Sequence, residues 1–122
     1  MLKFRNTEYH CPMELTMDLI GGKWKSLVLW HLGENVLRFS QLKRALPKIT
    51  QKMLTQQLRE LEQDGLVKRF IYAQVPPKVE YSLTDSGQTL LPILRTMHQW
   101  GIDYAGQPTE IEQCAVVTDI TK

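Results

Sequence analysis

Apolar side chains recur at intervals of three and four residues in four stretches of the chain, which is the spacing of one helix face. The pattern predicts helices over residues 12–20, 24–32, 41–46 and 50–64. A glycine pair at 21–22 separates the first two, Gly33 ends the second and Pro47 ends the third. Because apolar side chains cover much of the circumference of the second helix, we expect it to lie at the centre of the core.

Capping residues mark the ends of these helices. Pro12 suits the first turn of a helix, where its missing N–H group is not needed. Ser40 and Thr50 can accept hydrogen bonds from the first backbone N–H groups of the third and fourth helices. We therefore expect both to be N-caps, and Gly65 to end the fourth helix after Asp64.

The fourth helix has two contrasting faces. Leu54, Leu58 and Leu61 fall on one narrow stripe, as expected for a buried side. The opposite side is basic and rich in amides, with Gln51, Lys52, Thr55, Gln56, Arg59 and Gln63. Carboxylates arrive only in the last turns, so we expect Glu60, Glu62 and Asp64 to lie away from anything that the first half contacts.

After Gly65 the pattern changes to that of strands. Residues 66–72 are β-branched, aromatic and basic, and residues 79–83 alternate apolar and polar positions. Residues 73–78 join the two strands into a hairpin, and Pro76 and Pro77 stiffen its tip. We expect Thr84 to cap one long last helix that extends to Tyr104, and we expect Pro92 inside it to kink the helix or to remove one hydrogen bond.

Size and composition place the chain among globular proteins of one domain. It has 122 residues, 43% of them hydrophobic, and a mean hydropathy of −0.28. No apolar run exceeds four residues, so we predict no membrane association and a cytoplasmic location. We expect residues 1–10 to form an N-terminal arm, 11–106 a single domain and 107–122 a C-terminal tail.

Charge is distributed unevenly although the formal net charge is only +2. Between Asn35 and Arg59 there is no acidic residue, and the six basic ones are Arg38, Lys43, Arg44, Lys48, Lys52 and Arg59. The chain has no P-loop, nucleophile elbow, HExxH motif or clustered carboxylate pair. Since these motifs are missing, we predict no enzyme activity and no cofactor. The three histidines are scattered along the sequence, so we predict no metal site.

A short helix, a tight turn, a longer helix with a polar face and a two-stranded ribbon form the order of a winged helix-turn-helix. The predicted fold is mainly α with a small β-hairpin, and the predicted partner is double-stranded DNA. On the fourth helix, which would enter the major groove, the expected contacts are Gln51, Lys52, Thr55, Gln56 and Arg59. On the preceding helix and the hairpin, the expected backbone and wing contacts are Arg38, Ser40, Lys43, Arg44, Lys48, Lys68, Arg69 and Lys78. The last three would extend the basic stripe along the wing toward the neighbouring minor groove.

Other interpretations of these patterns remain open. A winged helix can bind a protein instead of DNA, and Phe70, Tyr72 and Tyr81 are compatible with a single-strand or RNA binder. The three tryptophans, Trp24, Trp30 and Trp100, could line an effector pocket, although aromatic residues at helical spacing more often belong to a core.

Residues 11–104 resemble the HxlR-type family of bacterial winged helix-turn-helix transcriptional regulators. The most specific stretches are GGKW at 21–24, LTQQLRELEQDGL at 54–66 and PPKVEYSLT at 76–84. The resemblance implies a homodimer on pseudo-palindromic operators, formed by the first and last helices. The apolar residues expected at that dimer interface are Leu15, Leu19, Leu90, Leu94, Met97 and Tyr104.

Cys11 is a candidate sensor. It precedes Pro12 at the start of the first helix, where unpaired backbone donors and the helix dipole favour a thiolate. A cysteine at this place is similar to that of HxlR-type regulators, some of which sense quinones, aldehydes or disulfide stress. The effector would then be a small oxidant or electrophile, with Cys114 as a conceivable resolving partner. The alternative is a regulator that responds to a small ligand or a protein, with Cys11 purely structural in the dimer interface.

Overall fold

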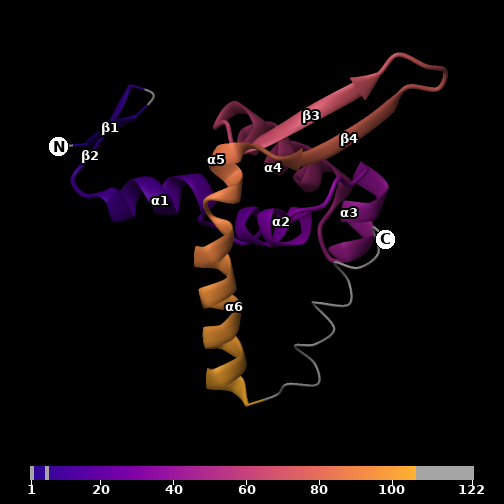
Figure 1. The fold of residues 1–122 in the computed structure, drawn as a ribbon. Coiled ribbons are helices and arrows are strands. Elements are labelled where there is room, and N and C mark those ends of the chain that lie inside the picture. The colour runs from indigo at the N-terminus through magenta and orange to yellow at the C-terminus, as the bar shows by residue number, and fades with distance from the viewer. Residues whose placement is uncertain (1, 5, 107–122) are drawn as a thin grey trace.

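The computed structural model describes residues 2–4 and 6–106, and Figure 1 shows how their elements are arranged. The helices are α1 (Pro12–Ile20), α2 (Lys25–Leu32), α3 (Phe39–Ala45), α4 (Gln51–Gln63), α5 (Asp85–Gln88) and α6 (Leu91–Ala105). The strands are β1 (Leu2–Phe4), β2 (Thr7–Tyr9), β3 (Val67–Tyr72) and β4 (Lys78–Leu83). The predicted mainly helical fold with a hairpin is confirmed, and β1 and β2 add a second antiparallel hairpin that the sequence analysis did not predict.

Helix α2 lies at the centre, as its apolar circumference predicts (Figure 1). Val28, Leu29 and Leu32 are fully buried, and the inner faces of the other helices close around them. The apolar core also contains Ile20, Leu37, Leu42, Leu46, Ile49, Leu54, Leu58, Leu61, Leu66, Val67, Leu83, Leu91 and Leu94. Burying one such leucine stabilises the fold by roughly 1.5–3 kcal/mol relative to an exposed position. This core fixes α3 and α4 against α2.

Strands β3 and β4 form the predicted hairpin, the wing, which projects away from the helices (Figure 1). Its register pairs Val67 with Leu83 at the buried base and Tyr72 with Lys78 near the tip. Leu37 adds a short bridge on the outer side of β4, where it exchanges two backbone hydrogen bonds with Tyr81 at 2.9 and 2.7 Å. This bridge attaches the wing to the segment between α2 and α3.

The start of α3 differs from the prediction. The helix begins at Phe39 and its N-cap is Arg38, so the assignment of Ser40 as N-cap is wrong. The side chain of Gln41 accepts the backbone N–H of Arg38 at 2.8 Å, which satisfies a donor that the predicted cap would have left to solvent. Ser40 is an exposed residue inside the first turn.

The predicted long last helix is divided into α5 and α6. Thr84 caps α5 as expected, since its hydroxyl accepts the N–H of Gly87 at 3.0 Å. The chain then breaks at Thr89 and Leu90, and Pro92 falls in the first turn of α6. A proline in the first turn removes no helical hydrogen bond, so Pro92 starts a helix. The prediction of a kink or of a lost hydrogen bond inside a continuous helix is therefore wrong. Among the described residues, no helix is long and apolar enough to cross a membrane.

Candidate nucleic-acid interface

Helix α4 is fixed at its first turn and along its inner face. The hydroxyl of Thr50 accepts the backbone N–H of Met53 at 3.0 Å, which confirms the predicted N-cap. Leu54, Leu58 and Leu61 are buried against the core, at most 2% exposed. The outward side chains are therefore held on a rigid element.

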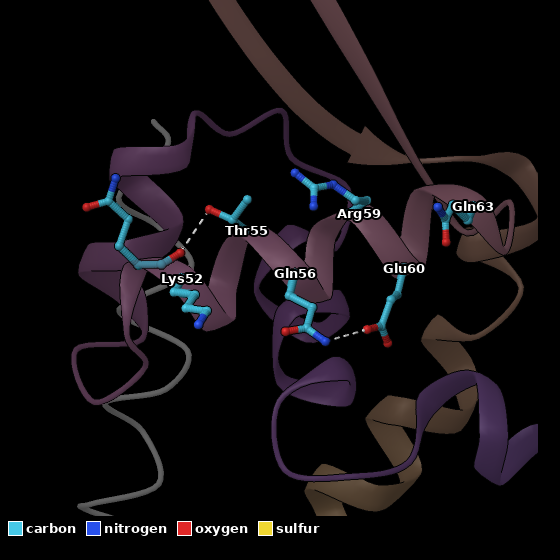
Figure 2. Close-up of a pocket in the computed structure, with 7 residues that line it drawn as sticks. Lys52, Thr55, Gln56, Arg59, Glu60 and Gln63 are labelled. Carbon is cyan, nitrogen blue, oxygen red and sulfur yellow. Dashed lines mark hydrogen bonds between the residues drawn. The ribbon is translucent and has the colours of Figure 1, made fainter.

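Figure 2 shows those outward side chains along one open face of α4. The residues that line it are Gln51, Lys52, Thr55, Gln56, Arg59, Glu60 and Gln63. The Thr55 hydroxyl donates to the backbone carbonyl of Gln51 at 2.9 Å, so this side chain lies close to its own helix. All five residues that the sequence predicts for the recognition helix are brought together here.

Glu60 does not follow the prediction for the carboxylates. Because it lies four residues after Gln56, it shares that residue's face, and the Gln56 amide donates to it at 3.1 Å. The ammonium of Lys25, at the start of α2, lies 2.8 Å from the other carboxylate oxygen. These two hydrogen bonds, that of Lys25 foremost, lower the pKa of the Glu60 carboxyl. The expectation that Glu60 lies apart from the first half of α4 is wrong.

The predicted backbone contacts around α3 differ in how free their side chains are. Arg38, Ser40, Arg44 and Lys48 are exposed. Lys43 is half-buried, and its ammonium lies 3.4 Å from the carbonyl oxygen of Pro47 in the turn before α4. Lys43 thus contacts its own turn, while the other four can reach a ligand directly.

The wing does not carry its cations as one stripe, which corrects the sequence analysis. Side chains alternate along a strand, so Lys68 and Tyr72 lie on one face of β3 and Arg69 lies on the other. Arg69 faces α4, 3.7 Å from Glu62, while Lys78 lies on the Lys68 face, beside Tyr72. The wing therefore has one cation beside α4 and two on the side that faces away.

Aromatic residues occupy the far face of the wing as well. Phe70 is 60% exposed and packs against Tyr72, whose hydroxyl donates to Glu80 at 2.6 Å. That hydrogen bond raises the pKa of the Tyr72 phenol. Tyr81 lies on the other face and is half-buried, and burial raises the pKa of its phenol. The three aromatic residues therefore do not form one exposed surface.

The family of the chain follows from its similarity to known proteins. A protein-family model described as HxlR-like helix-turn-helix matches residues 19–109. The chain belongs to the HxlR-like helix-turn-helix family. It is 50% identical over 109 residues to YdeP of Bacillus subtilis (strain 168), an uncharacterized HTH-type transcriptional regulator, with 89% of this chain and 85% of YdeP covered.

Solved structures similar to this HxlR-like chain include the redox regulator HypR in two forms. The oxidized form is 56% identical with a TM-score of 0.74, covering 76% of this chain and 96% of HypR. The reduced form is 52% identical with a TM-score of 0.75, and the match covers 82% of this chain and 98% of HypR. The predicted winged helix-turn-helix is confirmed, and the chain is a DNA-binding transcriptional regulator, not an enzyme.

Cys11 of this HxlR-like regulator is exposed at the start of α1. The carboxylate of Glu14 accepts the backbone N–H groups of His10 and Cys11 at 2.7 and 3.0 Å. Glu14 thereby satisfies the backbone donor of the N-cap residue, Cys11, and that of the residue before it. Cys114 lies outside the described residues, which hold no cluster of three or more side chains able to bind a metal.

Helices α1 and α6 of the HxlR-like fold expose a second, apolar surface. Its large exposed side chains, called here the α1–α6 apolar surface, are Met13, Met17, Ile93, Met97, Trp100 and Tyr104. Of the predicted interface residues, only Met97 and Tyr104 belong to it. Leu15 is half-buried, and Leu19 and Leu90 pack against the core.

Leu94 is 3% exposed and belongs to the core of its own chain, so its assignment to a dimer interface is wrong. The predicted interface takes Leu94 from the buried stripe of α6 and Met97 and Tyr104 from the exposed one. Ile93, Met97, Trp100 and Tyr104 follow each other at intervals of four, three and four residues, which is the signal that could have found them. Trp100 is 64% exposed, so it is not a core tryptophan, and it stacks on Tyr104 with ring centroids 4.8 Å apart. Trp24 and Trp30 are partly buried against the core, as expected.

Proposed function

We propose that this chain regulates transcription as a homodimer that reads pseudo-palindromic operators with α4 of each copy. The observation that carries the proposal is the outer face of α4, where amide and cationic side chains stand on a helix anchored by buried leucines. An α-helix fits the major groove, and amides and guanidinium groups are the donors and acceptors that distinguish base pairs there.

The side chains of α4 divide into two roles in this proposal. Gln51, Thr55 and Gln56 would approach base edges, and Gln56 has the donor and acceptor that adenine requires. Lys52 and Arg59 would meet phosphate or guanine. The flanking set that would fix register on the phosphates comprises Arg38, Ser40, Lys43, Arg44, Lys48 and Arg69. Lys68 and Lys78 lie on the far face of the wing and are left out of this set. Within it, Arg69 is supported by its place beside α4, and Lys43 is the least free.

Salt titration of duplex binding tests the DNA-binding role. Each phosphate contact releases counterions, so affinity for the operator must fall steeply as potassium chloride rises. The double variant Lys52→Glu, Arg59→Glu should lose at least tenfold in affinity and show a shallower salt slope. Arg95→Glu reverses a charge on α6 instead and should bind as the wild type does. Binding that ignores both the salt and the double variant would contradict the proposal.

The homodimer is supported by the α1–α6 apolar surface. Contiguous exposed apolar side chains on both helices are typical of a protein interface. A two-fold pair would place the second recognition helix about 34 Å along the duplex, where the matching half-site lies. Sedimentation of the purified chain tests this, and a monomer at concentrations that bind the operator would contradict it.

Thiol sensing through Cys11 is the finer part of the proposal. It is supported by the exposure of Cys11 and by the similarity to HypR, which is described as a redox regulator. Diamide or a quinone should weaken operator binding of the wild type and leave Cys11→Ser unaffected. Equal responses would remove Cys11 from the mechanism and favour the alternative, a small ligand or protein partner acting elsewhere.

A further inference from the structure

Glu60 occupies a position that a DNA-binding face would ordinarily avoid. It lines the same open face of α4 as Lys52, Gln56 and Arg59, and its side chain is 36% exposed (Figure 2). A carboxylate so placed repels phosphates, because like charges at short range are unfavourable even in water. Its presence there calls for a physical role.

Lys25 balances this charge from a different helix. Its ammonium lies 2.8 Å from Oε1 of Glu60, and its side chain is only 14% exposed. Since Lys25 opens α2, the central helix of the core, the ion pair joins the carboxylate on α4 to a second, buried helix. The pair adds no net charge to the face, and it holds Glu60 in one orientation.

The second oxygen of Glu60 acts on Gln56. Oε2 accepts a hydrogen bond from Nε2 of Gln56 at 3.1 Å, as the dashed line in Figure 2 marks. A carboxylate can only accept, so the NH₂ end of the amide must point toward Glu60 and its oxygen away from it. One N–H and the carbonyl oxygen of Gln56 stay available, and these are the groups that pair with adenine in the major groove.

We propose that Glu60, held by Lys25, is a positioning residue that fixes the direction in which the Gln56 amide meets a base. The inference rests on the proposed reading of bases by Gln56 and adds the reason for its selectivity. An amide free to turn by 180° offers donor and acceptor in either order, whereas the locked amide offers them in one order. Lys25 and Glu60 therefore set specificity without contacting DNA.

Substitutions at Glu60 separate orientation from charge. In Glu60→Gln the new amide turns its oxygen to Lys25 and its NH₂ to Gln56, which must then reverse. In Glu60→Ala the Gln56 amide is free. Glu62→Gln is the matched control, since it removes the same charge from the same helix but its partner is Arg69. Thermal unfolding of all three variants verifies that each is folded.

Selection of bound fragments from random duplexes measures the preference at each base pair. Both Glu60 variants should lower the preference for adenine about three- to tenfold at the one position that Gln56→Ala relaxes. This loss is only part of the discrimination that a bidentate side-chain contact to a base provides. Binding to random duplex should be unchanged or stronger, and Glu62→Gln should keep every preference within about twofold.

Two results would overturn the inference while leaving the proposed function intact. One is unchanged preference in both Glu60 variants although Gln56→Ala relaxes one position. The other is an equal change at all positions, which would mean that Glu60 acts through its charge alone. If the wild type itself selects no sequence, the base-reading function fails, and the positioning role fails with it.

Discussion

Helices α4 and α6 are built alike on the inside and differ on the outside. Each buries leucines against α2, with Leu54 and Leu58 on α4 and Leu91 and Leu94 on α6. The outer face of α4 is composed of amides and charges. The outer face of α6 is apolar, and Trp100 on it is 64% exposed.

This difference indicates that the buried residues of a helix determine how it packs in the fold, whereas its exposed residues indicate which kind of partner it can bind. A polar outer face is stable in water and gains further from a polyanion whose counterions it displaces. An apolar outer face is unfavourable in water and gains from a protein surface that covers it. Substitutions on the inner and outer faces of the two helices test this distinction.

The largest effect is expected at Leu94, on the inner face of α6. Leu94→Glu places a carboxylate in the core without a partner, at a cost of several kcal/mol, which is comparable with the whole stability of a small domain. Circular dichroism on heating should show loss of the cooperative transition. A folded dimer of Leu94→Glu would mean that the two stripes of α6 have been assigned in reverse.

The next effect is expected at Met97, on the outer face of the same helix and 51% exposed. Met97→Glu should leave the unfolding transition in place, because the side chain is outside the core. It should give a monomer by sedimentation and lower operator affinity at least tenfold, since one recognition helix reads only half a site. Arg95→Glu, on the opposite side of α6, is the control and should remain dimeric.

On α4, neutral truncations should distinguish phosphate contact from base reading. Lys52→Ala should weaken binding to operator and random duplex alike and reduce the salt slope by about one. Gln56→Ala should instead lose about 1–3 kcal/mol of discrimination at a single base pair. Fluorescence anisotropy with both duplexes measures this, and identical losses for the two variants would refute the division of roles.

A smaller effect is expected at the helix starts. Thr50→Ala removes the side-chain cap of α4 and should reduce the free energy of unfolding by about 1 kcal/mol. Thr96→Ala removes a hydroxyl of α6 that bonds only the carbonyl of Pro92 in its own helix, so its effect should be smaller. Urea unfolding compares the two, and a larger loss for Thr96→Ala would contradict the capping role.

The smallest effect is expected for the pH dependence of stability, through a histidine on α2, the helix against which both α4 and α6 pack. His31 on α2 is 4% exposed, and burial lowers the pKa of its imidazole from 6.5. The unfolded chain therefore takes up a proton before the folded one does. Stability should be unaffected above pH 6.5 and should fall as pH drops from 6.5 toward the folded pKa.

Denaturant unfolding between pH 7.5 and 5 measures this dependence. The decrease should be smaller in His31→Gln, which carries no titratable group at that position. His10→Gln should behave as the wild type, because His10 is exposed. A wild type whose stability rises as pH falls below 6.5 would contradict the assignment to His31.

Local sequence patterns predicted helices α1 to α4, the wing hairpin and the polar outer face of α4, but neither the β1–β2 hairpin nor the break between α5 and α6. The spacing of Leu54, Leu58 and Leu61, with Thr50 as cap, places the polar residues of α4 on one side of a helix, because helical geometry is local. Side chains alternate along a strand, so the sequence of β3 already predicts that Lys68 and Arg69 lie on opposite faces of the wing. The charge pattern alone suggested a single stripe.

Three features follow only from the way in which the helices and the wing pack together, as seen in the three-dimensional structure. It showed which of two apolar stripes of α6 is buried, joined Leu37 to the wing, and brought Lys25 of α2 against Glu60 of α4. Both stripes have helical spacing, and Lys25 and Glu60 are far apart along the chain. Periodicity reports only which side chains share a face, whereas contact between faces depends on how the helices pack, and that is settled by the shape of the whole core.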